Sequence, residues 1–246
     1  MKKQLLKFKS LLLIPYIREK FVLARIFYFV KLKRRLKTQD SNEAFEKTLA
    51  HNLKGLRMCN NRMDLLIKPV SVIETLNKKS KILVIGPRNE NDLFSLLGHG
   101  FAWNNIYGLD LISYSKRIFL GDMHSMPFGN DFFDAVLCGW TLSYSSTPEK
   151  AAKEILRVVK DRGIVGIGVE YTTMLKEDAE HLLGYSIQDY SKLSKRVNSS
   201  SAILSLFNGN IEHLFFDHDA PNRISHTREG FASKVSNVIT VFSIKK

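Results

Sequence analysis

Cysteine is scarce in this sequence: Cys59 and Cys138 are the two thiols among 246 residues, and they lie far apart. Such a pair makes neither the framework of a disulfide-stapled fold nor a cysteine metal site, and it favours a reducing compartment. Glycine and proline are modest, at 14 and 6 residues, which excludes collagen-like and low-complexity disordered chains. We therefore expect a cytoplasmic globular protein.

The N-terminal segment lacks a long apolar stretch. Within the first 40 residues the longest run without a charged side chain is 10–17, far short of the roughly 20 residues that a membrane-spanning helix needs. A signal peptide requires a longer apolar core and a small-residue cleavage site, and neither is present. The sequence thus predicts neither a membrane span nor a secretion signal.

Acidic residues are also few in this segment. Residues 1–40 hold 12 of the 37 Lys and Arg residues but only Glu19 and Asp40 among the acids, so they carry +10 of the net charge of +13. In the remainder of the chain, positive and negative charges nearly balance, so that part gives little indication of polyanionic partners.

The apolar residues of this segment recur at helical spacing after Pro15, which is expected to break or kink a helix. Lys and Arg interleave with them, as is typical of a helix that lies on an anionic membrane surface. The same pattern suits packing on the protein's own body or contact between copies. Nucleic-acid binding would use the basic residues against phosphates, but the aliphatic content argues for burial. The apolar positions are Phe21, Val22, Ile26, Phe29 and Val30.

Three parts follow from the change in pattern along the chain. Residues 1–40 form a basic amphipathic arm, and residues 41–79 show helical spacing with polar interruptions, which predicts a helical lead-in. A polar stretch at 77–80 marks a boundary, and residues 80–246 form the main domain. Contact of the arm with the inner face of an anionic membrane is one of the open interpretations.

The main domain alternates short apolar segments with helical ones. The pattern predicts a Rossmann-like, mostly parallel, seven-stranded sheet with helices on both faces and a C-terminal antiparallel hairpin. A loop or a single helical turn is expected at 113–115 and a turn at 161–163, and Thr147 is placed to cap the helix that follows it. Strands are predicted at 81–86, 106–111, 117–120, 132–139, 164–169, 210–216 and 238–244, and helices at 90–97, 147–159 and 199–207.

Two acids stand where the ligand of such a sheet is expected, outside the carboxyl ends of parallel strands. Asp110 lies near the C-terminal end of the second predicted strand, and Asp122 follows the third. Two acceptor oxygens at a strand end suit a vicinal diol. The glycine pattern G-x-G-x-x-G is absent, which argues against a nicotinamide-dependent oxidoreductase.

Residues 81–170 resemble the class I S-adenosylmethionine-dependent methyltransferases of the small-molecule type. The most specific segment begins at Gly121, where a Gly-Asp, a Pro-Phe and an Asp-Phe-Phe-Asp precede an apolar strand at the family's spacing. The resemblance implies S-adenosyl-L-methionine as cofactor and methyl transfer to an oxygen or nitrogen of a small-molecule, lipid-linked or sugar-linked acceptor. The segments that carry it are KILVIGPRNE, GLDL, GDMHSMPFGNDFFDAVLCGWTLSY and KEILRVVKDRGIVGIG.

The resemblance also implies a role for each matching residue. Gly86 would lie against the methionine part of the cofactor, and Asp110 would accept hydrogen bonds from both ribose hydroxyls. Asp122 would receive the adenine amino group, with the Met123 backbone N–H meeting a ring nitrogen. The residues placed beside the methyl donor are Gly139, Trp140 and Thr141.

The glycine loop departs from the family. Relatives have an acid two residues before the first glycine and further glycines two and four after it, whereas this chain has Val84, Arg88 and Glu90 there, with Pro87 in between. A loop with one glycine approaches a ligand less closely. Either Asn89 and Glu90 supply side-chain contacts to the cofactor's ammonium, or binding is weak. We count Pro87 with this loop among the cofactor-binding residues.

Candidates for a general base near the expected pocket are His124, Tyr144 and Tyr171, with His favoured by its near-neutral pKa. Base catalysis is not required, because methyl transfer from a sulfonium is an in-line displacement that positioning accelerates. No metal site is expected, since neighbouring residues of a strand at 213–219 point to opposite faces. The alternative function is a catalytically silent relative that binds a partner or a membrane through its arm.

Overall fold

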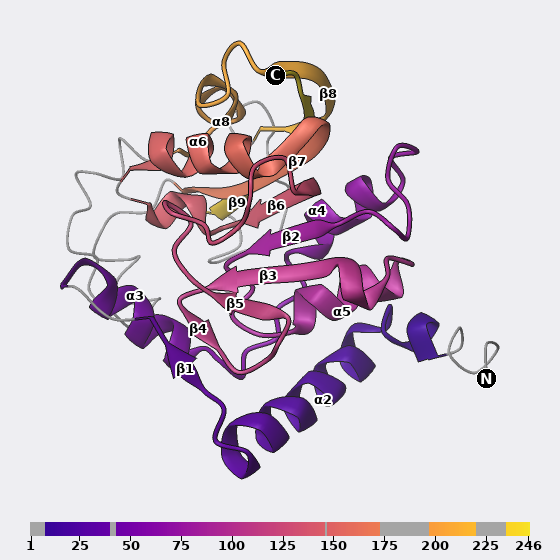
Figure 1. Ribbon diagram of the computed structural model, residues 1–246, viewed down its shortest axis with the longest axis vertical. Coiled ribbons are helices and arrows are strands. Elements are labelled where there is room, and N and C mark those ends of the chain that lie inside the picture. The colour runs from indigo at the N-terminus through magenta and orange to yellow at the C-terminus, as the bar shows by residue number, and fades with distance from the viewer. Residues whose placement is uncertain (1–7, 40–42, 146, 173–196, 220–234) are drawn as a thin grey trace.

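The computed structural model describes residues 8–39, 43–145, 147–172, 197–219 and 235–246 (Figure 1). Seven strands form one sheet in the order β5-β3-β2-β6-β7-β9-β8. The first five are parallel to one another, while β9 runs antiparallel to both β7 and β8. The predicted fold is therefore confirmed. The strands are β2 Ile82–Ile85, β3 Ile106–Asp110, β5 Ile118–Leu120, β6 Phe133–Gly139, β7 Val159–Thr172, β8 Ile211–His218 and β9 Val235–Ile244.

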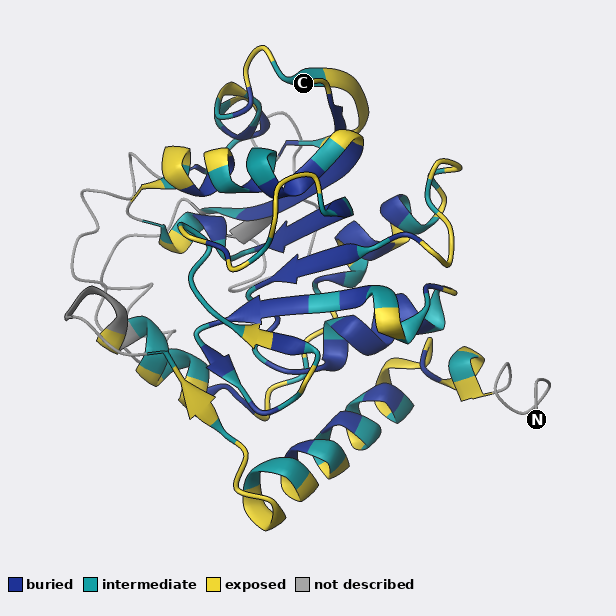
Figure 2. Ribbon diagram, in the orientation of Figure 1, coloured by how far each residue is buried: buried dark blue, intermediate teal, exposed yellow. Residues whose placement is uncertain are grey.

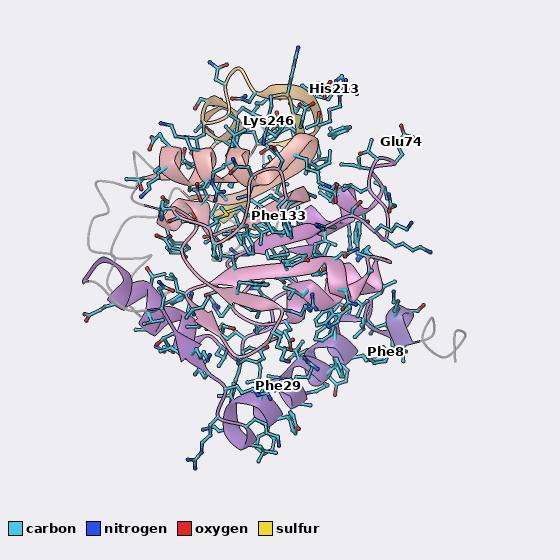
Figure 3. All side chains as sticks on the ribbon, viewed as in Figure 1. Phe8, Phe29, Glu74, Phe133, His213 and Lys246 are labelled. Carbon is cyan, nitrogen blue, oxygen red and sulfur yellow. The ribbon has the colours of Figure 1, made fainter. Side chains whose placement is uncertain are left out.

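Successive side chains of each strand point to opposite faces of the sheet, and both faces are apolar. Helices therefore cover both faces. On one face, Ile82 and Val84 pack with apolar residues of α2 (Pro15–Ile26), α4 (Asp64–Ser71) and α5 (Asn91–Gly98). On the other, Leu83 and Ile85 pack with α6 (Pro148–Val158) and with residues of α8 (Ser200–Ser205). Figure 3 shows Phe133 among the side chains of the sheet and Phe29 on the distant arm.

Polar lead-in and arm segments complete the molecule. α3 (Glu43–Lys54) precedes α4, and a π-helical turn η1 (Phe27–Leu32) continues α2. Two short 3-10 helices, η2 (Trp103–Asn105) and η3 (Leu142–Tyr144), lie before β3 and after β6. In the described part of the chain, no helix combines the length and apolar character that crossing a membrane requires.

The arm packs one face on the protein itself. Pro15 occupies the first turn of α2, where a missing N–H costs nothing. Arg18, Val22 and Ile26 are buried along one stripe of this helix, while the opposite side is exposed, as the alternating colours of α2 in Figure 2 show. The interpretation that the helix packs on the body therefore holds for this stripe.

Arg18 anchors that stripe with a fully buried guanidinium. It forms an ion pair of 2.9 Å with Asp64 and donates to Asn61 Oδ1 at 2.6 Å, to Asn91 Oδ1 at 3.1 Å and to the Leu12 carbonyl at 3.1 Å. A buried charge is tolerated only with such partners, because leaving water costs several kcal/mol. The contacts join the arm, the start of α4 and the start of α5.

Three local predictions need correction. Ser113, expected within a loop or helical turn at 113–115, instead forms β4 together with Ile112, and β4 pairs antiparallel with β1 (Lys37–Thr38) of the arm. Thr147 occupies the N-cap position of α6, but its side chain makes no capping hydrogen bond. The turn predicted at 161–163 lies inside β7, where the pairing with β6 jumps from Val159 to Ile164 and Arg162 adopts a φ of 58°.

The division into arm, lead-in and main domain stays a prediction. Contacts nevertheless cross both boundaries: β1 pairs with β4, and Arg18 bonds to residues of the lead-in and of the main domain. The arm is therefore packed as part of one structure rather than as a separate tail.

We expect the substitution Arg18→Ala to lower the free energy of unfolding by about 3–5 kcal/mol, because it leaves the partly buried Asp64 carboxylate without its cation. Urea denaturation monitored by circular dichroism measures this change. Lys20→Ala on the exposed side of the same helix is the matched control and should stay within about 0.5 kcal/mol of the wild type. Equal stability of the two variants would contradict the anchoring role.

Candidate active site

The predicted site residues meet at one edge of the sheet. Ile85 pairs with Leu109 of β3 and with Cys138 of β6, and Asp110 pairs with Leu120 of β5. The carboxyl ends of these four parallel strands are therefore neighbours. Gly86, Asp110, Asp122 and Gly139 each lie at the end of one of them or within two residues after it.

Gly86 lets two strand tips approach closely. Its φ is 71°, a left-handed conformation that favours glycine. A Cβ at this position would lie 3.0 Å from Thr141 Cβ and closer still to its hydroxyl oxygen. The Gly86 N–H donates to the Leu109 carbonyl at 2.8 Å. The loop after β2 is thus held against the tips of both β3 and β6.

The Asp110 carboxylate is buried and bonded within the protein. Its Oδ1 accepts from Asn52 Nδ2 at 3.0 Å and from the Ile112 N–H at 3.2 Å, and its Oδ2 accepts from the Arg88 N–H at 2.7 Å. Burial raises the pKa of Asp110, while the Arg88 and Ile112 hydrogen bonds oppose that rise. A carboxylate has about four acceptor positions, so a vicinal diol would use the remaining one and the one held by Asn52.

Asp122 and His124 form a hydrogen-bonded chain that reaches the loop after β6. Asp122 Oδ1 lies 2.7 Å from His124 Nδ1, and His124 Nε2 lies 2.6 Å from Ser145 Oγ. The same Oδ1 accepts the His124 N–H at 3.1 Å. Among the residues that the structure describes, Asp122 Oδ2 has no hydrogen-bond partner, so this oxygen is available to an amino group. Met123 packs against the core beside them.

Polar side chains surround Trp140 next to the tip of β6. It has a φ of 57°, and its indole N–H donates to Asn237 Oδ1 at 3.1 Å. The Arg62 guanidinium lies over its ring, 5.1 Å from the centroid, and forms an ion pair with Glu170 at the end of β7. Four distant segments therefore contribute to one polar, partly exposed cluster. We call Arg62, Trp140, Glu170 and Asn237 the tryptophan cluster.

The side chains of Asn89 and Glu90 are already bound by the protein. Asn89 Nδ2 donates to the carbonyls of Leu56 and Met58, both at 3.0 Å. Glu90 is buried, and its oxygens accept from Arg25 at 2.7 and 2.9 Å and from the Ser115 hydroxyl at 2.5 Å. Their contact with a cofactor ammonium stays a prediction, and for Glu90 it would mean sharing or breaking an ion pair.

The remaining candidates lie at the rim of this region or elsewhere. Tyr144 is half exposed in η3, and Tyr171 lies near the end of β7. The ring of Pro87 lies against Gly108 of β3. Within the described ranges there is no group of three or more His, Cys, Asp or Glu side chains arranged to hold a metal ion. Asp219 is buried there and accepts the N–H and hydroxyl of Ser200.

Several contacts at the site could not be found from sequence pattern. Asn52 lies in the lead-in, and Arg62 lies just before α4, so neither belongs to a motif that resembles the family. Ser145 and Asn237 likewise gave no periodic signal. Glu170 had one usable signal, since it stands at the end of the predicted fifth strand, next to Tyr171.

Part of the chain matches a known protein family. Residues 93–167 match a family model described as a methyltransferase domain. This chain carries a class I S-adenosylmethionine-dependent methyltransferase domain. The family implies S-adenosylmethionine as the methyl donor. The match includes Asp110, Asp122, Gly139 and Trp140, whereas the altered glycine loop precedes it. No curated protein matched the sequence.

Solved structures share the fold at low identity. One is a chain from the complex between the Haloferax volcanii Trm112 methyltransferase activator and a putative methyltransferase, with a TM-score of 0.52, 13% identity, and coverage of 84% of this chain and 98% of that one. A putative sarcosine dimethylglycine methyltransferase from Galdieria sulphuraria has a TM-score of 0.52 and 13% identity, with coverage of 90% and 97%. A putative methyltransferase from Methanococcus maripaludis has 0.50 and 16%, with coverage of 85% and 98%.

We expect Gly86→Ala to destabilise the protein, because a left-handed backbone costs an alanine about 1–2 kcal/mol and the added methyl group meets Thr141. The double variant Gly86→Ala/Thr141→Ala should recover the part due to the hydroxyl clash. Thermal unfolding measures both. Gly129→Ala is the control, since a Cβ there meets nothing within 4 Å; a Gly86→Ala variant as stable as this control would contradict the close approach.

Proposed function

We propose that this methyltransferase domain transfers a methyl group to an oxygen or nitrogen atom of a small-molecule, lipid-linked or sugar-linked acceptor. The observation that supports it best is the pair of carboxylates at the neighbouring tips of β3 and β5. Asp110 keeps one acceptor position and shares another with Asn52, and Asp122 keeps a whole oxygen, within the described residues. One suits a sugar diol and the other an amino group on a ring.

The residues present fit S-adenosylmethionine. When bound, this cofactor supplies a methyl group made electrophilic by its sulfonium. Asp110 would hold the ribose and Asp122 the adenine, with Met123 offering its backbone N–H. Gly86, Gly139 and Trp140 at the tips of β2 and β6 would border the reacting part. Holding donor and acceptor in line supplies much of the rate in such a displacement.

The tryptophan cluster is the proposed acceptor side. It stands at the ends of β6 and β7, immediately beside Gly139, and it presents a guanidinium, a carboxylate, an amide and an indole. Arg62 and Glu170 are both more than a third exposed at their side chains, so an acceptor with hydroxyl or amino groups can reach them. These groups offer both donors and acceptors, which suits a polar acceptor. His124 and Tyr144 remain the candidate bases.

Calorimetric titration with S-adenosylmethionine and with S-adenosylhomocysteine tests the proposal. Asp110→Asn or Asp122→Asn should weaken binding by about 1–3 kcal/mol, because each removes charge-assisted hydrogen bonds. Asp134→Asn is the matched control: that carboxylate lies near the opposite end of β6, bonded to the Lys81 N–H and to Lys160. Absence of heat with either compound at millimolar concentration would refute the proposed function.

A second candidate role, favoured by the exposed side of the arm, is attachment to an anionic membrane surface with or without catalysis. Tyr16, Phe27 and Leu32 are 67, 56 and 61% exposed, respectively. Lys20 lies 5.0 Å from the Tyr16 ring centroid. Aromatic and aliphatic side chains among lysines suit the headgroup region of such a membrane. Attachment would place a lipid-linked acceptor near the domain.

Vesicle co-sedimentation tests this attachment. The wild type should pellet with vesicles containing phosphatidylserine and remain in the supernatant with phosphatidylcholine alone, since each basic residue near an anionic surface contributes about 1 kcal/mol. The triple variant Tyr16→Ser/Phe27→Ser/Leu32→Ser should pellet less while keeping the wild-type unfolding curve. Equal pelleting of the two proteins with phosphatidylserine would remove the membrane role.

A further inference from the structure

Three side chains in the loops after β5 and β6 are joined end to end. Asp122 Oδ1 lies 2.7 Å from His124 Nδ1, and His124 Nε2 lies 2.6 Å from Ser145 Oγ. A carboxylate oxygen can only accept a hydrogen bond, so Nδ1 carries the proton of the neutral ring. Nε2 is then the acceptor, and the Ser145 hydroxyl donates to it. An acid, a histidine and a serine in this order form the arrangement that activates a nucleophilic hydroxyl.

Local backbone turns hold the acid and the base in place. Asp122 Oδ1 also accepts the backbone N–H of His124 at 3.1 Å, and the Asp122 carbonyl accepts the Ser125 N–H at 3.1 Å. This is the turn that an aspartate makes with the residues that follow it. The side chains of Asp122 and His124 are 23 and 12% exposed, so the hydrogen bond between them is largely shielded from water and is strengthened by that shielding.

The serine is held from the other side by the start of a helix. The Ser145 N–H donates to the carbonyl of Leu142 at 3.0 Å, and Leu142 is buried in the core. Ser145 Oγ accepts the N–H of Thr147 at 3.1 Å, one residue before α6 begins. A backbone N–H and the positive end of a helix both favour negative charge on that oxygen. Ser145 is only partly buried, and its neighbour Tyr144 is half exposed, so the hydroxyl lies close to solvent.

A structural tie between the two loops would need less than this. One hydrogen bond from Ser145 to the ring suffices to join the loop after β5 to the loop after β6. The second hydrogen bond, from the opposite ring nitrogen to Asp122, fixes the tautomer that can accept the hydroxyl proton and stabilises the imidazolium that results. The loops therefore hold a proton acceptor with its counter-charge as well as a tether.

We propose that Asp122, His124 and Ser145 form a nucleophilic triad that hydrolyses carboxylic esters, an activity beyond methyl transfer. Ser145 Oγ bonds to the ester carbonyl carbon as its proton passes to His124 Nε2. The bond from that carbon to the alcohol oxygen then breaks, and the alcohol leaves with the proton. Water adds to the acyl carbon through the same histidine, which releases the carboxylic acid and restores Ser145. The triad uses Oδ1 of Asp122, whereas the proposed adenine contact uses Oδ2.

Labelling of the full chain with a fluorophosphonate probe tests the nucleophile. Attack by an activated serine displaces fluoride, so peptide mass spectrometry should find the phosphonyl group on Ser145. His124→Gln should slow this labelling about 100- to 10,000-fold, the usual contribution of a general base. Ser143→Ala in η3 is the matched control and should be labelled like the wild type. Absence of the group from Ser145, or equal labelling of the wild type and His124→Gln, would overturn the proposal.

Turnover of 4-nitrophenyl acetate tests hydrolysis. The wild type should release many equivalents of 4-nitrophenolate per chain, Ser145→Ala should lose this activity, and Ser143→Ala should keep it. Ser145→Ala should also retain the wild-type unfolding curve, because the hydroxyl that it removes is only partly buried. Equal rates for the wild type and Ser145→Ala would overturn the hydrolytic activity. Calorimetry with S-adenosylhomocysteine is a separate measurement, so failure of the triad leaves the proposed methyl transfer standing.

Discussion

The buried carboxylate of Asp110 joins three segments that are far apart in the sequence. It accepts the N–H of Arg88 in the loop after β2, the N–H of Ile112 at the start of β4, and the side-chain amide of Asn52 on α3. Burial makes the charged form costly and raises the pKa of this group, so these donors keep the carboxylate usable as an acceptor. The geometry of the loop after β2, of β4 and of α3 thus depends on one charge.

A second set of charges attaches the arm to the same region. Arg25 binds the buried Glu90 at the start of α5, and Arg18 binds Asp64 at the start of α4. Part of the positive charge that is so concentrated in residues 1–40 is therefore used inside the molecule, against single carboxylates. The basic residues on the outer side of α2 remain exposed, so the arm has two faces with different chemistry.

There are physical reasons why the sequence predicted some elements of the fold and not others. Apolar runs ending in glycine or aspartate predicted β2, β3 and β6, and parallel strands necessarily bring Asp110 and Asp122 to one edge. β4 was missed because its partner, β1, is a two-residue strand in the arm, and such short pairings leave no period. Thr147 was assigned as a cap from residue type alone, whereas capping depends on side-chain orientation.

The site was harder to predict than the fold for the same reason. The link from His124 to Ser145 and the contact of Asn52 with Asp110 join residues of separate loops and helices, which no spacing along the chain encodes. Glu90 stays a prediction as a ligand contact: its place in the glycine loop suggested that contact, and its carboxylate is buried against Arg25. The substitution of glycine by Arg88 was visible in the sequence, but its buried Nε, which has no hydrogen-bond partner among the described residues, was not.

The pairing of β1 with β4 has a consequence for how the chain is made on the ribosome. Residues 37–38 emerge early, yet their partner strand at 112–113 is translated some 75 residues later. Asp64, Glu90 and Asn91, which bind the arm, also follow it in the sequence, so this basic and apolar segment precedes all of these partners in the nascent polypeptide. The packing of the N-terminal segment is therefore complete only after β4 has been translated.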